Sequence, residues 1–250
     1  MKSPVVGISM GDPAGIGPEI ILSMLTGPEG LPSCRLMIIG NQEVLNETAR
    51  RQGVVNPCLP VNPLSEIGAS QPGPFVLDLK NMRAGDYTPG VLSPQAGSAS
   101  VDYVIKGIDL ALEGKIDALV TAPIHKEAIR LAGYHYPGHT EILAERTGTV
   151  NYGMMLVGGP IRVVLVTTHL PLRDVPGAIT TGNVLDKIRL AADGMAALGL
   201  EAPRLAVAGL NPHSGEGGIF GDEEELIIAP AVRQARQEGL EVSGPLPPDT

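Results

Sequence analysis

Residues 9–20 read SMGDPAGIGPEI, and this turn, rich in glycine and proline, decides how the chain begins to fold. It follows the apolar run of residues 5–8 and precedes the apolar run of residues 20–22, so we expect it to join a first strand to a first helix. Pro18 suits the first turn of a helix, where its missing N–H leaves no bond unmade, and Glu19 complements the positive end of the helix dipole.

The same turn does not have the sequence of a phosphate-binding loop. Neither the G-x-G-x-x-G spacing nor the Walker spacing is present, and the carboxylate of Asp12 would repel a phosphate. What the turn holds has to be inferred from the rest of the chain.

Outward from this turn, short apolar runs alternate with helical patterns. We expect strands at residues 4–9, 35–40, 74–79, 116–121, 152–157, 161–168 and 204–210, and helices at residues 18–26, 41–52, 95–113, 125–132, 139–147, 182–199 and 222–239. This alternation is typical of an α/β fold with a mostly parallel sheet. Residues 162–168 are apolar on both faces, which predicts a central strand covered on both sides. Residues 57–74, rich in Pro, Ser and Gly, predict a loop or a crossover between two lobes.

The composition favours an ordinary soluble globular protein over a nucleic-acid or membrane protein. The 250 residues are enough for one large α/β domain or two small ones. A formal net charge of −9 argues against affinity for nucleic acid or anionic membranes, and 3% aromatic residues argue against base stacking. An anionic substrate would need a local cluster of donors.

The chain carries no pattern of a targeting or membrane segment. Glycine and aspartate interrupt the first apolar run, so we expect no signal peptide and place the protein in the cytoplasm. Residues 154–166 form the longest apolar candidate, but two glycines, a proline and an arginine interrupt them. Cys34 and Cys58 lack the spacing of a disulfide framework or a thiolate metal site.

Two of the five histidines follow predicted strands and are candidates for metal ligands. His169 follows the strand that ends at Thr168, and His213 follows the strand at residues 204–210. If these strands are parallel neighbours, both imidazoles emerge at one sheet edge, where they could bind a divalent ion and leave positions open for substrate oxygens. Two ligands alone are too few, and a histidine hydrogen-bonded for packing is the alternative for each.

His139 and Thr140 precede a helical pattern and predict an anion site. Their side chains, with the free N–H groups of the helix, suit a phosphate or a carboxylate, although an ordinary cap by Thr140 is the alternative. His125 and Lys126 follow a strand end and could face the same cleft, whereas His135 is expected in a solvated loop.

Two further features lie near His213. The acids of residues 222–225 open the last long helix, and we interpret them as a solvated helix start. The glycine-rich residues 215–221 could wrap a ligand bound near His213.

Taken together, the motifs GDPAGIGPE, TAPIHK, GHTE, TTHLPLRD, GLNPHSGEGG and GPLPPDT resemble the 4-hydroxythreonine-4-phosphate dehydrogenase family of vitamin B6 biosynthesis. The resemblance covers the whole chain. The opening turn is also similar to the shorter GDGIGPE turn of isocitrate and isopropylmalate dehydrogenases, whose two-lobed fold the family shares. It therefore implies two interleaved α/β lobes over residues 1–250, with a cleft between them.

The resemblance implies a reaction and its cofactors. Family members oxidise the secondary alcohol of 4-phosphohydroxy-L-threonine with NAD, and NADP is possible. The product is a 3-oxo acid that decarboxylates to 3-amino-2-oxopropyl phosphate. By the same resemblance, His169 and His213 match two ligands of a divalent metal (zinc, magnesium or cobalt), and His139 and Thr140 match a substrate-binding pair. Asp249 is our candidate for the base, with a metal-bound water as the alternative.

The resemblance further implies a homodimer whose metal site is completed across the subunit interface. Family members continue beyond the motif of residues 244–250 with a third metal histidine, further substrate-binding residues and much of the nucleotide site. This chain is therefore expected to be truncated at its C-terminus relative to the family, and its sequence identifies no nucleotide-binding residue.

Three other functions remain open. The first is a related dehydrogenase of phosphorylated threonate or erythronate, or of a cyclic dihydrodiol. The second is a metal-dependent hydrolase, for which two histidines and a carboxylate would suffice. The third is a ligand-binding remnant without activity.

Overall fold

The structure, a computed structural model, describes residues 3–28, 30–61, 73–83, 85–200 and 202–249. The chain divides into two compact units, Met1–Thr149 and Val150–Thr250. Each unit has its own strands and its own buried apolar cluster.

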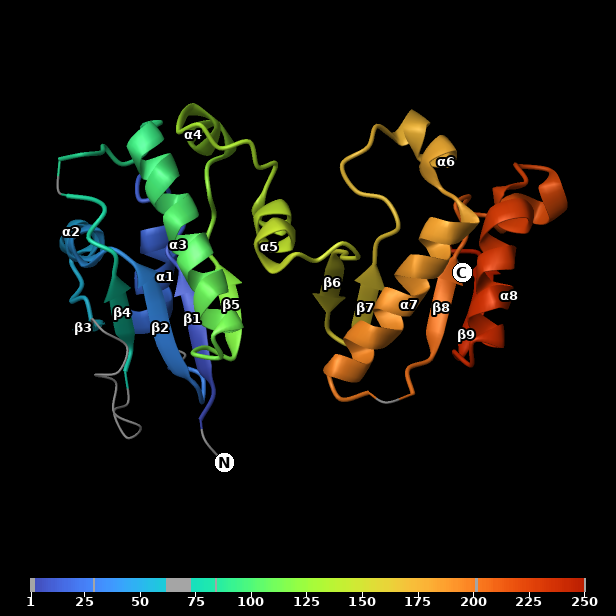
Figure 1. Cartoon of the computed structure of the whole chain (residues 1–250), viewed down its shortest axis with the longest axis horizontal. Helices are drawn as coiled ribbons and strands as arrows, with labels where there is room; N and C mark the ends of the chain where they lie inside the picture. The colour runs from blue at the N-terminus through green and yellow to red at the C-terminus, as the bar shows by residue number, and fades with distance from the viewer. Residues whose placement is uncertain (1–2, 29, 62–72, 84, 201, 250) are drawn as a thin grey trace. The chain divides into compact units, whose positions relative to one another are not determined.

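Unit 1 is built on a parallel sheet (Figure 1). Its strands are β1 (Val5–Ser9), β2 (Arg35–Gly40), β3 (Leu59–Val61), β4 (Phe75–Asp78) and β5 (Ala118–Thr121). The five strands run in the order β3-β4-β2-β1-β5, and every pair is parallel. The predicted α/β class with a parallel sheet is therefore confirmed for this unit. Since β1 and β5 are paired, the segments that follow them emerge at the same edge of the sheet.

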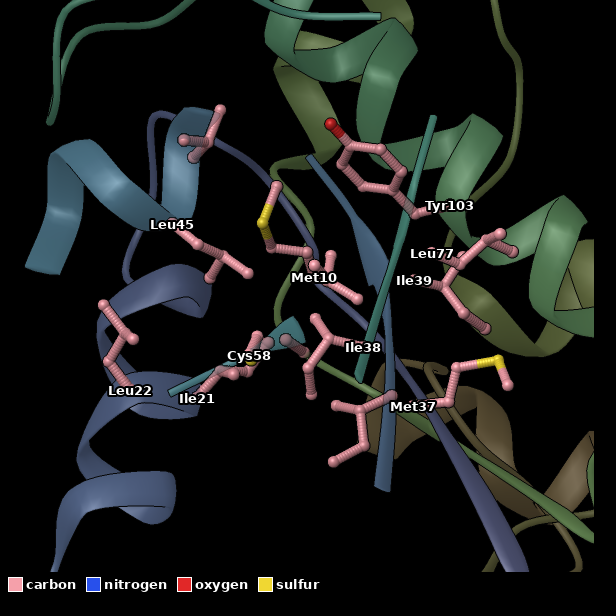
Figure 2. Packing of buried hydrophobic residues seen from close by; sticks show 14 of the residues in the cluster. Met10, Ile21, Leu22, Met37, Ile38, Ile39, Leu45, Cys58, Leu77 and Tyr103 are labelled. Atoms are coloured by element: carbon pink, nitrogen blue, oxygen red, sulfur yellow. The ribbon is translucent and has the colours of Figure 1, made fainter. Parts of the chain in front are cut away.

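Helices cover both faces of this sheet. They are α1 (Gly17–Thr26), α2 (Gln42–Gln52), α3 (Pro94–Leu112), α4 (Lys126–Leu131) and α5 (His139–Thr147). Figure 2 shows Leu22 of α1 and Leu45 of α2 on one side of the strands and Tyr103 of α3 on the other. Successive side chains of β2, such as Met37 and Ile38, leave the strand on opposite sides and are both buried. This two-sided burial explains why the strands of unit 1 are continuous apolar runs.

The long helix α3 is held close to α4 by a glycine. A Cβ at Gly97 would overlap the backbone of Ala128, so only glycine permits this approach of the two helices. The side chain of Ser93 caps α3 by accepting the Ala96 N–H at 3.2 Å. Because α4 and α5 both contact α3, this helix positions the segments that follow β5.

Unit 2 contains two separate strand pairs (Figure 1). The strands are β6 (Met155–Gly158), β7 (Ile161–Val164), β8 (Leu205–Ala208) and β9 (Val242–Leu246). Strands β6 and β7 are antiparallel, whereas β8 and β9 are parallel. The helical segments are η2 (Leu172–Asp174), α6 (Val175–Ala178), α7 (Thr181–Ala197), η3 (Ser214–Gly218), the π-helix η4 (Glu224–Ile228) and α8 (Ala229–Gln237).

The core of unit 2 lies between α7, η4, α8 and the pair β8–β9. Its buried members are Val184, Leu185, Ile188, Ile228, Ala231, Val232, Ala235 and Val242. Helix α7 begins with a capping box, in which Thr180 and Asn183 each bond the backbone N–H of the other. This core supports the two loops that carry His213 and Asp249, since both loops follow its parallel strands.

One predicted strand differs from expectation in length, partner and burial. Residues 161–168 were expected to form a central strand, but β7 ends at Val164 and pairs with β6 alone among the described residues. Ile161 is 64% exposed and Val163 is 44% exposed, so this prediction is wrong. An apolar run shows that a segment is hydrophobic, but it does not show which part of the protein covers it. In the β6–β7 hairpin these side chains stay exposed.

Other differences are smaller. Strand β3 lies within residues 57–74, which were expected to be a loop or crossover, and residues 62–72 of that segment lie outside the described residues. Strand β9 and helix α6 were not expected. Cys34 and Cys58 are free thiols, and burial raises the pKa of Cys58 to about 12, which makes it unreactive. No helix within the described ranges has the length and apolar character needed to cross a membrane.

Candidate active site

The opening turn of residues 9–20 packs against the end of β5. The Asp12 N–H donates to the Pro123 carbonyl at 3.0 Å, and a Cβ at Gly11 would overlap that same carbonyl. Gly11 also has a φ of +72°, a conformation that favours glycine. The glycines of the turn therefore bring two backbone segments into contact at the carboxyl edge of the sheet.

Asp12 fixes the shape of this turn from inside. Its Oδ1 accepts the Ala14 N–H at 2.8 Å, and its backbone carbonyl accepts the Gly15 N–H at 2.9 Å. Burial raises the pKa of Asp12, and its bonds to backbone N–H groups together with nearby His125 oppose that shift. The turn is thus held by its own carboxylate.

His139 lies beside this turn as a half-buried, neutral imidazole. Burial lowers its pKa from the usual 6.5, and the bond that its ring donates to the Ala122 carbonyl opposes this shift in part. Its Nε2 is buried and has no hydrogen-bond partner among the described residues. Since buried polar atoms are nearly always paired, the unpartnered Nε2 points to a ligand that forms a hydrogen bond with it.

Thr140 follows His139 at the start of α5 but does not cap the helix. The N-cap is Gly138, and no side chain accepts the first N–H groups within the described residues. The alternative of an ordinary cap by Thr140 is therefore wrong. The first turn of α5 keeps free donors and the positive end of the helix dipole, which together suit an anion.

His125 has a different role from the one expected. Its Nδ1 accepts the Ala128 N–H at 3.2 Å and caps α4, which places the ring proton of the neutral form on Nε2. Lys126 begins α4 and is exposed, and His135 is exposed in the loop before α5, as expected.

In unit 2, His213 stands on a tightly bent loop after β8. Its backbone N–H donates to Asn211 Oδ1 at 2.9 Å, and its ring lies 5.9 Å from that of Phe220, centroid to centroid. Its Nδ1 lies 3.4 Å from Glu216 Oε1 and 3.8 Å from Asp249 Oδ2. The structure thus brings His213 and Asp249 together.

The loop after His213 has an unusual backbone. Ser214 and Glu216 have positive φ values of 54° and 43°, and the glycines between and after them are also left-handed. Residues other than glycine rarely adopt this backbone conformation, and those that do occur frequently at functional sites. His169 shares this property, with a φ of 59°.

The structure does not place His169 and His213 on neighbouring strands. His169 follows β7, which pairs with β6, whereas His213 follows β8, which pairs with β9. The condition of two neighbouring parallel strands is therefore not met within the described residues, because an apolar pattern does not specify which strands pair. Among the described residues, no three His, Cys, Asp or Glu side chains are grouped closely enough to hold a metal.

The donors present fit a divalent metal in kind but not in number. Imidazole and carboxylate are the ligands that zinc and related ions take, and the carboxylates of Glu216 and Asp249 lie 3.4 and 3.8 Å from the Nδ1 atom of His213. A complete metal site would need ligands in addition to the side chains that lie close together in the described part of the chain. The roles of His169 and His213 as metal ligands therefore stay predictions.

Sequence reasoning missed one residue near His213. Glu224 is 5% exposed, although it belongs to the acidic run 222–225 that was expected to be solvated. Its Oε1 accepts the Asn211 N–H at 2.8 Å. The only sequence signal was its place in a helical pattern, four residues before Ile228 and therefore on the side that faces the core.

Comparisons with known proteins place the chain in one family. The family model described as "Pyridoxal phosphate biosynthetic protein PdxA" matches residues 32–250. The 4-hydroxythreonine-4-phosphate dehydrogenase of Desulfosudis oleivorans is 44% identical over 249 residues, which cover 99% of this chain and 73% of that protein. The D-threonate 4-phosphate dehydrogenase of Salmonella typhimurium is 39% identical and covers 100% of this chain, with 76% of that protein matched.

A crystal structure shows the same architecture. The 4-hydroxythreonine-4-phosphate dehydrogenase of Klebsiella pneumoniae is 38% identical and superposes with a TM-score of 0.89. The match covers 99% of this chain and 75% of that one.

Proposed function

This chain belongs to the PdxA family of pyridoxal phosphate biosynthetic proteins, and from that membership we propose that it oxidises 4-phosphohydroxy-L-threonine with NAD. Two relatives, 44% and 45% identical, are named 4-hydroxythreonine-4-phosphate dehydrogenases, and such dehydrogenases are oxidoreductases. The proposed product is a 3-oxo acid that loses carbon dioxide to give 3-amino-2-oxopropyl phosphate.

The unpartnered Nε2 of His139 is the observation that carries the proposal. We propose that this nitrogen carries the lone pair of the neutral ring and accepts a hydrogen bond from a hydroxyl or an ammonium group, both of which the substrate has. The free N–H groups at the start of α5, with the Thr140 hydroxyl, suit its phosphate or carboxylate. His139 and Thr140 are therefore the proposed substrate-binding pair.

The reaction needs a proton acceptor as well as a hydride acceptor. NAD, when bound, would supply the acceptor for the hydride from the secondary alcohol carbon, and the O–H proton must pass to a base. Asp249, near His213, is the proposed base. A divalent metal held by His169 and His213 would, when bound, act as a Lewis acid on the reacting oxygen.

The proposal includes the assembly and the cofactor expected from the family. We infer a homodimer that completes the metal site across its interface, in the cytoplasm, with NAD as oxidant or NADP in its place. The two-lobed fold of isocitrate and isopropylmalate dehydrogenases is the fold that we propose for binding both ligands. Zinc, magnesium and cobalt are the candidate ions.

A second candidate is the oxidation of D-threonate 4-phosphate. It is favoured by the Salmonella relative, which is named for that substrate and matches the whole of this chain at 39% identity. The two substrates differ in an ammonium group, which D-threonate 4-phosphate replaces with a hydroxyl. Both groups donate hydrogen bonds, so a lone pair on His139 accepts from either.

The experiment is a substrate comparison on the purified chain. NADH formation is measured with NAD and each divalent ion, on 4-phosphohydroxy-L-threonine, D-threonate 4-phosphate and a cyclic dihydrodiol. We expect the highest kcat/KM with 4-phosphohydroxy-L-threonine and no phosphate release without NAD. A higher kcat/KM with D-threonate 4-phosphate would establish the second candidate, and phosphate release without NAD would indicate a hydrolase.

A further inference from the structure

Glu224 is a buried carboxylate beneath the loop that carries His213. Within the described ranges, Asp12 and Glu224 are the two acidic side chains that are buried, and Asp12 is explained by its turn. Glu224 begins the π-helix η4, a rare conformation that occurs frequently at functional sites. Burial of a carboxylate carries a large cost in free energy, so its presence requires a reason.

The contacts of Glu224 lead to His213 in two steps. Glu224 Oε1 accepts the Asn211 N–H at 2.8 Å. The Oδ1 atom of Asn211 in turn accepts the His213 N–H at 2.9 Å. The carboxylate therefore holds the residue that holds the backbone of His213.

The loop has glycines at two positions where its backbone comes close to this carboxylate. A Cβ at Gly209 would lie 3.1 Å from Glu224 Oε1, and a Cβ at Gly215 would lie 3.0 Å from Glu224 Oε2. Both distances are tighter than ordinary van der Waals contact. The glycines on either side of His213 thus let the backbone close around Glu224.

The bent backbone of the loop needs such support. The left-handed conformations of Ser214 and Glu216 persist only where surrounding contacts determine them. Glu224 Oε2 and the Ser214 hydroxyl are both buried without a partner in the described part of the chain. Stability alone does not explain such an arrangement, because an apolar residue of the same size would avoid the unpaired oxygen.

We propose that Glu224 is a positioning residue that sets the orientation of His213 through Asn211. The inference rests on the proposed function, in which His213 takes part in the reaction, and it adds a residue that touches neither substrate nor cofactor. In this proposal Oε1 positions the loop as a hydrogen-bond acceptor, and the negative charge of the carboxylate is not required.

The test compares three substitutions with a matched control. Glu224→Leu removes the acceptor and keeps the bulk, and Glu224→Gln keeps an oxygen that can accept the Asn211 N–H. Glu224→Asp withdraws the acceptor by one methylene and replaces the leucine variant if that variant does not fold. The control is Glu225→Gln, an exposed neighbour in the same π-helix.

Two measurements are made on each full-length variant. The first is hydrogen exchange of residues 209–221 in the protein without ligands, compared with exchange in α7. The second is kcat and KM on the substrate that gives the highest kcat/KM in the substrate comparison. Thermal unfolding verifies that each variant folds.

We expect Glu224→Leu to speed exchange in residues 209–221 by about tenfold and to leave α7 unchanged, since it removes one buried acceptor. We expect kcat to fall by about tenfold to a hundredfold with KM within about twofold, because the reacting groups lose their alignment. Glu224→Gln should restore kcat to within about threefold of the parent, because the amide oxygen replaces the carboxylate as acceptor. Glu225→Gln should behave as the parent.

Unchanged exchange in Glu224→Leu would overturn the proposal, and so would faster exchange with an unchanged kcat. A loss in Glu224→Gln equal to that in Glu224→Leu would also overturn it, because charge would then be the requirement. If the parent does not turn over any of the substrates, the proposed function fails, and the exchange measurement alone decides whether Glu224 holds the loop.

Discussion

At the scale of single residues, the unpaired Nε2 of His139 gives the most direct prediction. We expect His139→Ala to lower kcat/KM by about tenfold to a hundredfold, the worth of one hydrogen bond to a charged group. The measurement is steady-state kinetics on the substrate that gives the highest kcat/KM in the substrate comparison. His135→Ala, at an exposed histidine of the neighbouring loop, is the control and should leave kcat/KM unchanged.

The pH dependence of the same residue follows from its lowered pKa. Because burial holds the pKa of His139 below 6.5, the midpoint of its protonation lies below that pH, and the neutral ring is the major form above it. Substrate affinity should therefore keep most of the contribution of His139 above pH 6.5. The free energy of unfolding should decrease below pH 6.5, since the unfolded ring binds a proton that the folded ring does not. Loss of affinity with a midpoint above 6.5 that His139→Ala abolishes would contradict this assignment.

The residue scale also shows how far sequence reasoning extends. The turn of residues 9–20 and the pair His139–Thr140 were singled out because glycine, proline and histidine have local meanings that a sequence displays. Glu224 could not be singled out in the same way. Its neighbours are also acids, and only the packing of η4 against η3, α7 and β9 decides which member of the run is buried.

At the scale of elements, the approach of α3 to α4 gives a stability prediction. Gly97→Ala would place a methyl group against the backbone of Ala128, which cannot rotate away as a side chain can. The free energy of unfolding in urea should fall by about 1–3 kcal/mol, as for other overpacked positions.

Gly182→Ala in α7 is the matched control for this helix substitution. A Cβ at that position would have Thr180 Oγ1, 3.9 Å away, as its nearest neighbour. Alanine is favoured over glycine in a helix, so this variant should be stabilised by up to about 1 kcal/mol. Equal effects of the two substitutions would show that the contact between α3 and α4 is not tight.

Helices and strands were predictable where the hydrophobic pattern was long and the element was buried on one face or on all sides. Helix α3 and strands β1 and β2 were expected at nearly their observed bounds, since the sheet of unit 1 is covered on both faces. Strand β9 was not, because it contains Gly244 and Pro245 and has no alternation. Strand β7 was assigned the wrong setting, because hydrophobicity does not state which partner covers a strand.

At the scale of the whole molecule, the sequence predicted the fold class but not how its strands are shared among sheets. A position of His169 and His213 at one sheet edge required two adjacent parallel strands, yet β7 and β8 belong to different pairs among the described residues. Strand pairing depends on contacts between distant segments, which no local pattern encodes. The placement of His213 near Asp249 follows from the pairing of β8 with β9, which only the structure shows.

The exposed hairpin of unit 2 gives a prediction about assembly. In the register of β6 and β7, Leu156 lies opposite Val163 and Gly158 lies opposite Ile161, so their side chains share one face of the hairpin. Leu156 is 52% exposed and Ile161 is 64% exposed. Large apolar side chains gathered on a surface favour association, so we expect the chain to self-associate.

The double substitution Leu156→Lys and Ile161→Lys should weaken this association. Burying one such side chain is worth about 1.5–3 kcal/mol, so the dissociation constant in sedimentation should rise at least about tenfold. The thermal midpoint should stay near that of the parent, because neither side chain is buried in the chain itself. Val55→Lys with Leu112→Lys is the control, since these side chains of unit 1 are 83% and 61% exposed and lie in different elements. Weaker association in the control, with no change in the hairpin variant, would place the contact between copies on unit 1.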